Sequence, residues 1–123
     1  MSPDRRRSTG QQGEAEAARF LRKQGFAILD QNVRSRLGEI DLVARDRGTL
    51  VFVEVKTRLA GPGDPPQAAV TPWKQARLGR LAQGYLKAKG LGEVRCRFDV
   101  VAVTLDPEGR VAHIRHIPGA FTL

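Results

Sequence analysis

Hydrophobic residues recur along the chain with two periods, one typical of helices and one typical of strands. Ala17, Ala18 and Leu21 follow helical spacing, which predicts a helix over residues 13–24. Residues 50–57 are rich in Val and Phe and are apolar on both faces, as expected of a central strand. The same patterns predict a second helix and four further strands, at residues 72–89, 26–33, 39–45, 94–105 and 110–117.

This order of elements, α-β-β-β-α-β-β, is typical of an α/β fold in which helices flank one mixed central sheet. Residues 59–70, directly after the central strand, are rich in Gly and Pro and are predicted to form a loop. Thr71 and Pro72 are suited to cap and begin the second helix, and Gly90 is suited to end it.

Length and charge narrow the classes of function. The chain has 123 residues, and we assign residues 1–11 to a flexible basic arm and residues 12–123 to a single domain. Lys and Arg number 21 against 13 Asp and Glu, and the net charge of +8 favours a polyanionic partner, nucleic acid before an anionic membrane. The alternative is a basic surface kept for solubility. We find no signal peptide and no apolar run long enough to span a membrane, and the single cysteine, Cys96, suits the reducing cytoplasm.

Charged side chains interrupt the otherwise apolar central strand. Glu54 and Lys56 are two residues apart, so they share a face with about 7 Å between their Cα atoms. A hairpin through residues 46–48 would bring Asp41 level with Glu54, with their Cβ atoms about 5 Å apart. Two carboxylates so close repel each other unless a divalent cation lies between them, and oxygen ligands suit Mg²⁺ or Mn²⁺. The alternative is a structural charge network among the three side chains.

Helical phase adds further candidates. Glu14 falls on the buried stripe of the first helix, whereas Glu16 is about 200° away and is predicted to face solvent. Lys74 falls on the buried stripe of the second helix, in its first turn, with Arg77 at the edge of that stripe. A lysine at this end opposes the helix dipole, which indicates a nearby anion, either the carboxylates or a phosphate. Alternatively, these side chains extend from the end of the stripe into water.

Other polar and aromatic residues carry weaker signals. His113 and His116 are three apart on a strand, so they face opposite sides, and we interpret them as ordinary edge-strand residues. Asp99 either supports the acidic site or pairs with an arginine, and we favour the arginine. Most aromatic residues are interpreted as core, so base stacking on nucleic acid is not evident.

At Asp41 and Glu54-Val-Lys56 the sequence resembles the PD-(D/E)xK nuclease superfamily, whose restriction-endonuclease-like core is αβββαβ. A resemblance over about residues 12–121 is to the YraN-like family of small bacterial proteins, usually described as endonuclease-like. It rests on Gly13-Glu14, Asn32, Gly38 to Ala44, Val51 to Arg58, Lys74 and Arg97 to Val100. Within the superfamily the chain looks closest to the archaeal Holliday-junction resolvases. One departure is Ile40, which stands where the superfamily motif has proline.

The resemblance implies metal ligation by Asp41 and Glu54, with help from the Val55 carbonyl and Glu14. It also implies that Lys56 orients or activates the attacking water. We therefore expect a cytoplasmic, Mg²⁺-dependent endonuclease that acts in DNA recombination or repair, on DNA rather than RNA, with branched DNA as one candidate substrate. Five basic residues are expected to contact phosphates: Arg34, Arg36, Arg58, Lys74 and Arg77.

Two alternatives stay open on the sequence. One is a non-catalytic nucleic-acid-binding module on a nuclease scaffold, and the other is a basic structural partner in a ribonucleoprotein assembly. The oligomeric state is also open, although a homodimer would suit the cutting of two-fold symmetric junctions.

Overall fold

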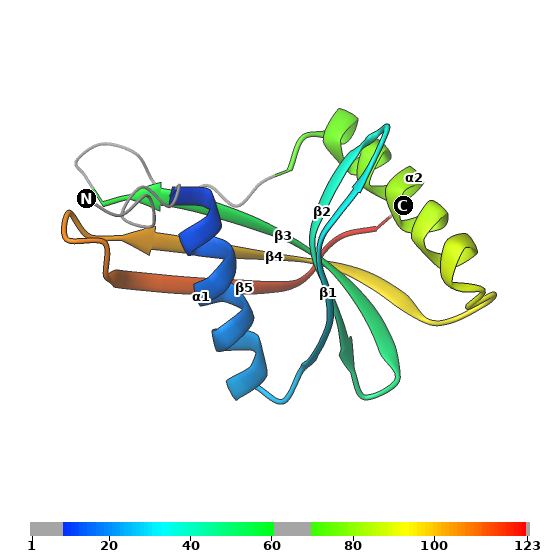
Figure 1. Ribbon diagram of the computed structural model, residues 1–123, viewed down its shortest axis with the longest axis horizontal. Helices are drawn as coiled ribbons and strands as arrows, with labels where there is room; N and C mark the ends of the chain where they lie inside the picture. Colours follow the sequence, from blue (N-terminus) through cyan, green and yellow to red (C-terminus); the bar gives the residue numbers. More distant parts are fainter. Residues whose placement is uncertain (1–8, 61–69, 123) are drawn as a thin grey trace, which may run out of the picture.

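The computed structural model describes residues 9–60 and 70–122, which form the predicted series of helices and strands (Figure 1). In chain order the elements are α1 Thr9–Lys23, β1 Ala27–Ser35, β2 Gly38–Asp46, β3 Thr49–Leu59, α2 Pro72–Lys89, β4 Cys96–Leu105 and β5 Val111–Phe121. The predicted fold class, a mixed sheet with flanking helices and an αβββαβ core, is confirmed.

Among the described residues, five strands form one sheet in the order β1-β2-β3-β4-β5. The β3–β4 pair is parallel and the other neighbours are antiparallel. A parallel pair cannot be joined by a tight turn, and α2 is part of the crossover between β3 and β4. The run at residues 50–57 lies in β3, at the centre of the sheet, as its apolar character predicted.

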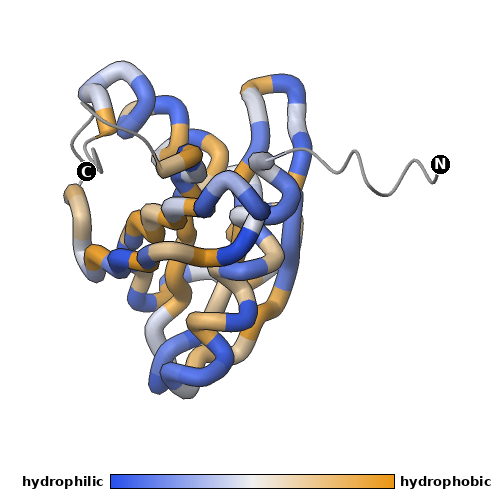
Figure 2. The backbone as a smooth tube through the Cα atoms, turned by 90° about the vertical axis from the view of Figure 1, so that its left-hand side faces the viewer, coloured by the Kyte–Doolittle hydropathy of each residue, from blue (hydrophilic) through white to orange (hydrophobic). Residues whose placement is uncertain are grey.

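The two faces of the sheet carry separate hydrophobic cores. On one face, α2 packs Leu78, Leu81 and Tyr85 against apolar side chains of the sheet such as Phe52. On the other face, α1 packs Ala17, Ala18 and Leu21 against the alternate side chains of the same strands. Hydrophilic and hydrophobic residues alternate along much of the chain (Figure 2).

Several element boundaries differ from the prediction. Helix α1 begins at Thr9, so the last residues assigned to the basic arm are helical, and residues 1–8 lie outside the described part of the chain. Strand β5 continues to Phe121 instead of ending at residue 117. Most of the predicted loop, residues 61–69, is also outside the described residues. In the part that is described, no helix is long and apolar enough to cross a membrane.

The residues predicted to begin and end α2 do so in the structure. The hydroxyl of Thr71 accepts a hydrogen bond from the Lys74 backbone N–H at 3.2 Å, and Pro72 occupies the first turn. Gly90 ends the helix in the left-handed conformation, with φ 64°. Within the helix, Gly84 is exposed, and a Cβ atom added to it would meet no other atom within 4 Å.

Replacing Gly84 with alanine is expected to raise the free energy of unfolding by about 0.5–1 kcal/mol, because glycine in a helix interior loses more backbone freedom on folding. Gly90→Ala is the matched control. It should lower stability, because alanine is strained at a positive φ. Urea unfolding of the two variants measures both effects. A loss of stability in Gly84→Ala would show that this glycine has a packing role.

Candidate metal centre

Strands β2 and β3 separate at Asp41. Their ladder runs from the hairpin turn to the pair Leu42–Val53, and the next pair in register would be Asp41 and Glu54. The Asp41 carboxylate instead accepts a hydrogen bond from the backbone N–H of Val55 at 2.7 Å. A buried N–H must find an acceptor, so the side chain satisfies a donor that the separating strand no longer reaches. Asp41 is thereby fixed at the point where the two strands diverge.

Helix α1 approaches this point closely. A Cβ atom added at Gly13 would lie 1.8 Å from Oγ1 of Thr57 on β3, so only glycine permits this contact between helix and strand. The next residue, Glu14, therefore reaches the same end of β3. The predicted position of Glu14 at the N-terminal end of the buried stripe agrees with its half-buried side chain.

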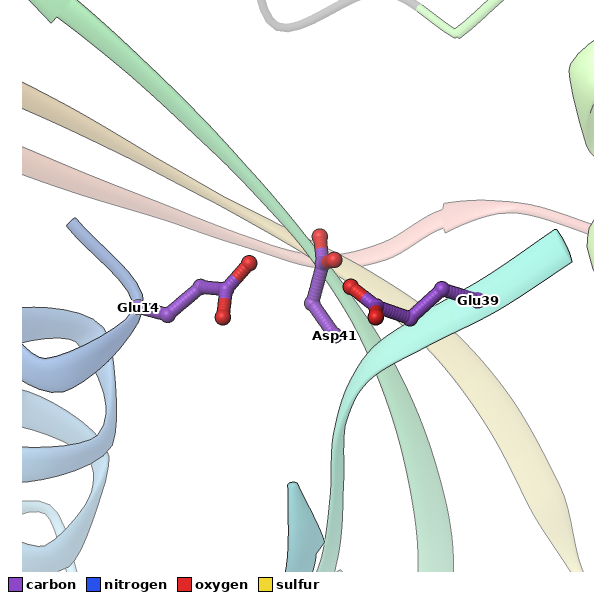
Figure 3. A group of neighbouring side chains, drawn as sticks. All are labelled: Glu14, Glu39 and Asp41. Carbon is purple, nitrogen blue, oxygen red and sulfur yellow. The ribbon is translucent and has the colours of Figure 1, made fainter. Parts of the chain in front are cut away.

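Three carboxylates converge at the divergence, and we call this set the acidic cluster: Glu14 of α1 and Glu39 and Asp41 of β2 (Figure 3). One oxygen from each lies within 4.8 Å of the others. The amide of Asn32 on β1 lies beside them. With its nitrogen turned toward the cluster it donates to Glu39 at 3.2 Å and to Glu14 at 2.7 Å. The side chains of two strands and one helix thus surround a single point.

The acidic cluster is electrostatically unfavourable without a cation. Burial, followed by the negative charge of Glu54, raises the pKa of Asp41 to about 7, although the hydrogen bond from Val55 lowers it. Burial also raises the pKa of Glu14, and the charge of Glu39 adds to that effect. The raised pKa values mean that the charged forms of Asp41 and Glu14 are disfavoured at this site, whereas Glu39 has a cationic partner in Arg34 at 2.9 Å. Three hard oxygen donors at this spacing suit a divalent cation such as Mg²⁺ or Mn²⁺.

Glu54 and Lys56 lie two residues apart on β3, and Glu54 is near enough to Asp41 for its charge to raise the pKa of that carboxyl group. The β2–β3 ladder ends at Leu42–Val53, one pair before the predicted Asp41–Glu54 pair. The carboxylate of Glu54 pairs instead with the ammonium group of Lys74 on α2, with 2.5 Å between Oε2 and Nζ. The anion predicted near Lys74 is therefore a carboxylate. Lys56 forms no ion pair with any described residue. The alternative interpretation, a structural charge network among Asp41, Glu54 and Lys56, is therefore not found among the described residues, where Glu54 pairs with Lys74 instead.

The remaining basic candidates lie in three places. Arg34 and Arg36 are at the β1–β2 turn, and the guanidinium of Arg34 is 2.9 Å from the carboxylate of Glu39. Arg58 is half-buried near the end of β3. Arg77 is half-buried on α2, with its guanidinium 4.8 Å from the centre of the Trp73 ring.

Three predictions need correction or refinement. Glu16 does not face open solvent, because its side chain is only 23% exposed and pairs with Arg19 at 3.6 Å. Asp99 pairs with Arg97 at 2.9 Å, as favoured, but it also binds His116 at 2.8 Å. His116 is therefore no ordinary edge-strand residue. A local motif does not show which residues of β4 and β5 lie close together, so the contact between Asp99 and His116 could not be predicted from the sequence.

Two residues of the site, Glu39 and Asn32, lie in the segments that carry the family resemblance but were not predicted to have a role in the site. Glu39 precedes Asp41 by two positions on one strand, and the alternation of side chains could have placed both on one face. Asn32 has a positive φ of 53°, which asparagine tolerates better than most residues. Its approach to the acidic cluster depends on the β1–β2 register, in which Val33 pairs with Ile40.

Comparison with known proteins gives a consistent result. Residues 13–103 match the model of a family described as uncharacterised protein family UPF0102. The chain is 50% identical over 115 residues to a UPF0102 protein of Syntrophus aciditrophicus, covering 94% of this chain and 89% of the relative. It is 50% identical over 116 residues to a UPF0102 protein of Moorella thermoacetica, covering 94% and 97%. The resemblance to the YraN-like family is thereby confirmed, and the chain belongs to the UPF0102 family.

Proposed function

We propose that this protein is a divalent-metal-dependent endonuclease of the PD-(D/E)xK type, which hydrolyses phosphodiester bonds in DNA. The observation that carries the proposal is the convergence of Glu14, Glu39 and Asp41 beside Glu54, with Lys56 unpaired among the described residues. A purely structural charge network would be expected to neutralise its own members. Of the three carboxylates only Glu39 has a cationic partner among the described residues, Arg34, and a divalent cation would supply the counter-charge that Glu14 and Asp41 lack there.

The residues present fit a hard divalent cation. Asp41 and Glu54 would hold it, with the carboxylate of Glu14 and the Val55 carbonyl as further ligands, and Glu39 joins this set. Bound Mg²⁺ or Mn²⁺ would polarise the scissile phosphate and lower the pKa of a water molecule. Lys74 would release Glu54 when the cation binds, because the same carboxylate cannot serve both partners fully.

Side chains of the protein would position the substrate and stabilise the reacting groups. Lys56 shares a face of β3 with Glu54, about 7 Å away along the strand, and would orient the attacking water or stabilise the charge that develops on the phosphate. Arg34, Arg36, Arg58 and Arg77 would hold flanking phosphates, which positions the strand without reading its sequence. The net charge of +8 would favour association with the polyanion.

A cleavage assay tests the proposal. The wild type and Asp41→Asn would be incubated with linear, nicked and branched DNA and with RNA, in Mg²⁺, in Mn²⁺ and in chelator. We expect cleavage of DNA by the wild type only when metal is present, and none by the variant. Binding of DNA without cleavage under every condition would favour the non-catalytic module instead.

The two glutamates of α1 provide a matched pair. Glu14→Gln should slow metal-dependent cleavage by about tenfold or more, because it removes one carboxylate from the acidic cluster. Glu16→Gln should cut at close to the wild-type rate, because Glu16 pairs with Arg19 outside the cluster. Initial rates at saturating protein measure both. Equal effects of the two substitutions would contradict the assignment of Glu14.

A further inference from the structure

A groove of about 520 Å³ lies between the β1–β2 turn and α2. Apolar side chains, including Val33, Ile40 and Leu81, form part of its lining. The basic lining residues are Arg34, Arg36, Arg80 and Lys89. A volume of this size is typical of a site for a small organic group such as a nucleobase. We call this space the α2 groove.

The lining of the α2 groove is net positive, although two of its basic residues are paired, Arg34 with Glu39 and Lys89 with Asp30. Four basic side chains line it, and within the described lining Asp30 is the one carboxylate. Asp30 is already engaged, because it accepts from the Tyr85 hydroxyl at 2.9 Å and lies 3.6 Å from the Lys89 ammonium. Arg36 and Arg80 form no ion pair with any described residue. An apolar interior with free cations around it is complementary to a group that is aromatic and anionic at once.

Gly84 keeps the α2 groove open. It lines the groove, and a Cβ atom added there would meet no atom within 4 Å. Glycine in a helix interior costs stability, and no close contact of the described chain requires it at this position. The absence of a side chain at Gly84 leaves space in the α2 groove that any other residue would occupy.

An exposed aromatic residue lies on the same stripe of α2 as two lining residues of the α2 groove, beyond the residues that line it. At 100° per residue, Trp73, Arg77, Arg80 and Gly84 fall within about 60° on one stripe of α2. The Trp73 side chain is 68% exposed, although the sequence analysis interpreted most aromatic residues as core. The guanidinium of Arg77 lies 4.8 Å from its ring centre. Trp73 immediately precedes Lys74, the partner of Glu54, so the stripe begins one residue from a contact with the proposed metal centre.

The α2 groove also reaches the acidic cluster from its other side. Asn32 lines the groove and lies beside the carboxylates of Glu14 and Glu39. A polymer in the groove would therefore pass close to the proposed centre. The stripe from Trp73 to Ala88 is about 22 Å long, which is enough for several nucleotides.

We propose that the α2 groove binds an unpaired strand of nucleic acid, with one base stacked on Trp73 and the backbone phosphates on Arg36 and Arg80. This inference rests on the proposed nuclease function and specifies its substrate as one with a single-stranded segment. Bases in a duplex are stacked inside it and cannot enter an apolar groove, whereas unpaired bases stack readily on aromatic side chains. A duplex would contact only the basic side chains at the edge of the groove.

The experiment compares Gly84→Met with Gln83→Met, both in the Asp41→Asn background and in chelator, so that cleavage does not affect the result. Gly84→Met fills the α2 groove, whereas Gln83 is exposed on α2 and does not line it. Fluorescence anisotropy with a labelled mixed-sequence DNA strand and its duplex measures affinity. Trp73, the single tryptophan, reports stacking through quenching of its fluorescence.

We expect the single strand to bind about tenfold more tightly than the duplex and to quench Trp73. Gly84→Met should weaken single-strand binding by about tenfold and leave duplex binding unchanged, and Gln83→Met should alter neither. Equal affinity for strand and duplex, or no effect of Gly84→Met, would overturn the proposal. A change in oligomeric state in Gly84→Met without a change in strand affinity would also overturn it and assign the groove to a second copy.

This outcome is separable from that of the cleavage assay. Strand binding that depends on Gly84 would support the α2 groove even if no metal-dependent cleavage were found. Cleavage without such dependence would support the nuclease and refute the groove.

Discussion

Replacing Lys56 with methionine is expected to slow metal-dependent cleavage of bound DNA by about 100-fold or more, with the fold and the DNA affinity retained. The reason is the pairing around β3. Glu54 has its counter-charge in Lys74, and Lys56 forms no ion pair with a described residue. Loss of the Lys56 ammonium should therefore affect the reacting phosphate and water more than the stability of the protein. Single-turnover cleavage at saturating protein, with thermal melts, measures both properties.

Lys74→Met is the matched control for Lys56→Met. It removes the partner of a buried carboxylate, so we expect a change in stability and in metal affinity. If Lys56→Met cuts bound DNA at the wild-type rate, Lys56 is not catalytic. If it instead melts at a much lower temperature than the wild type, its role is to balance the charge of the acids.

Replacing Asp99 with alanine is expected to lower the free energy of unfolding by about 3–5 kcal/mol, the usual effect of breaking a buried ion pair. Asp99 is fully buried and accepts hydrogen bonds from Arg97, His116 and the backbone N–H of Gly119. The contacts from His116 and Gly119 join β4 to the C-terminal part of β5. Without the carboxylate, the Gly119 N–H and the His116 ring lose their acceptor.

Asp46→Asn is the control for Asp99→Ala, since Asp46 pairs with the same Arg97 at 3.2 Å but is partly exposed. It should cost about 1 kcal/mol or less. Urea unfolding of the two variants gives the comparison. Equal losses would show that the burial of Asp99 contributes nothing, and an unchanged stability of Asp99→Ala would refute the role of this contact in joining the strands.

The pH dependence of the Asp99 contribution has a definite sign. Burial raises the pKa of Asp99, but hydrogen bonds from His116, Arg97 and Gly119 lower it by more than burial raises it. The pKa therefore lies below the ordinary value of 3.8. A carboxyl group with a lowered pKa stabilises the folded state above its unfolded pKa and loses that contribution as pH falls through its folded pKa. The difference in stability between the wild type and Asp99→Ala should therefore shrink below about pH 4.

The fold could be predicted largely because local signals agreed with the global arrangement. The apolar run of β3 indicated a central strand, and Thr71, Pro72 and Gly90 defined the ends of α2. Strand β5 was predicted too short because Pro118 and Gly119 look like a turn, yet the strand continues through them. Gly119 there has a positive φ of 57° and donates to Asp99, a contact that no local pattern reveals.

The site could be predicted only in part for a related reason. Alternation along β3 placed Glu54 and Lys56 on one face, and helical phase placed Glu14 near the sheet. The direction of each carboxylate depends on the divergence of β2 from β3, which the hairpin alone does not specify. Glu54 consequently turns to Lys74, and Glu39 takes a place in the acidic cluster that was not predicted.

The pKa of Asp41 predicts how metal binding should vary with pH. A carboxylate must lose its proton to bind a cation, and burial with the charge of Glu54 raises the pKa of Asp41 to about 7. Affinity for Mn²⁺ should therefore rise with pH and level off above about pH 7. Between pH 6 and pH 8 the expected gain is about tenfold.

Calorimetric titration of Mn²⁺ into the wild type, Asp41→Asn and Glu16→Gln at pH 8 is the most direct test of the proposed metal centre. The wild type and Glu16→Gln should bind the cation with the same affinity, because Glu16 lies outside the acidic cluster and pairs with Arg19. Asp41→Asn should bind at least about tenfold more weakly, because it loses a ligand. Equal binding by the wild type and Asp41→Asn, or no binding by either, would contradict the assignment of this cluster as the metal centre.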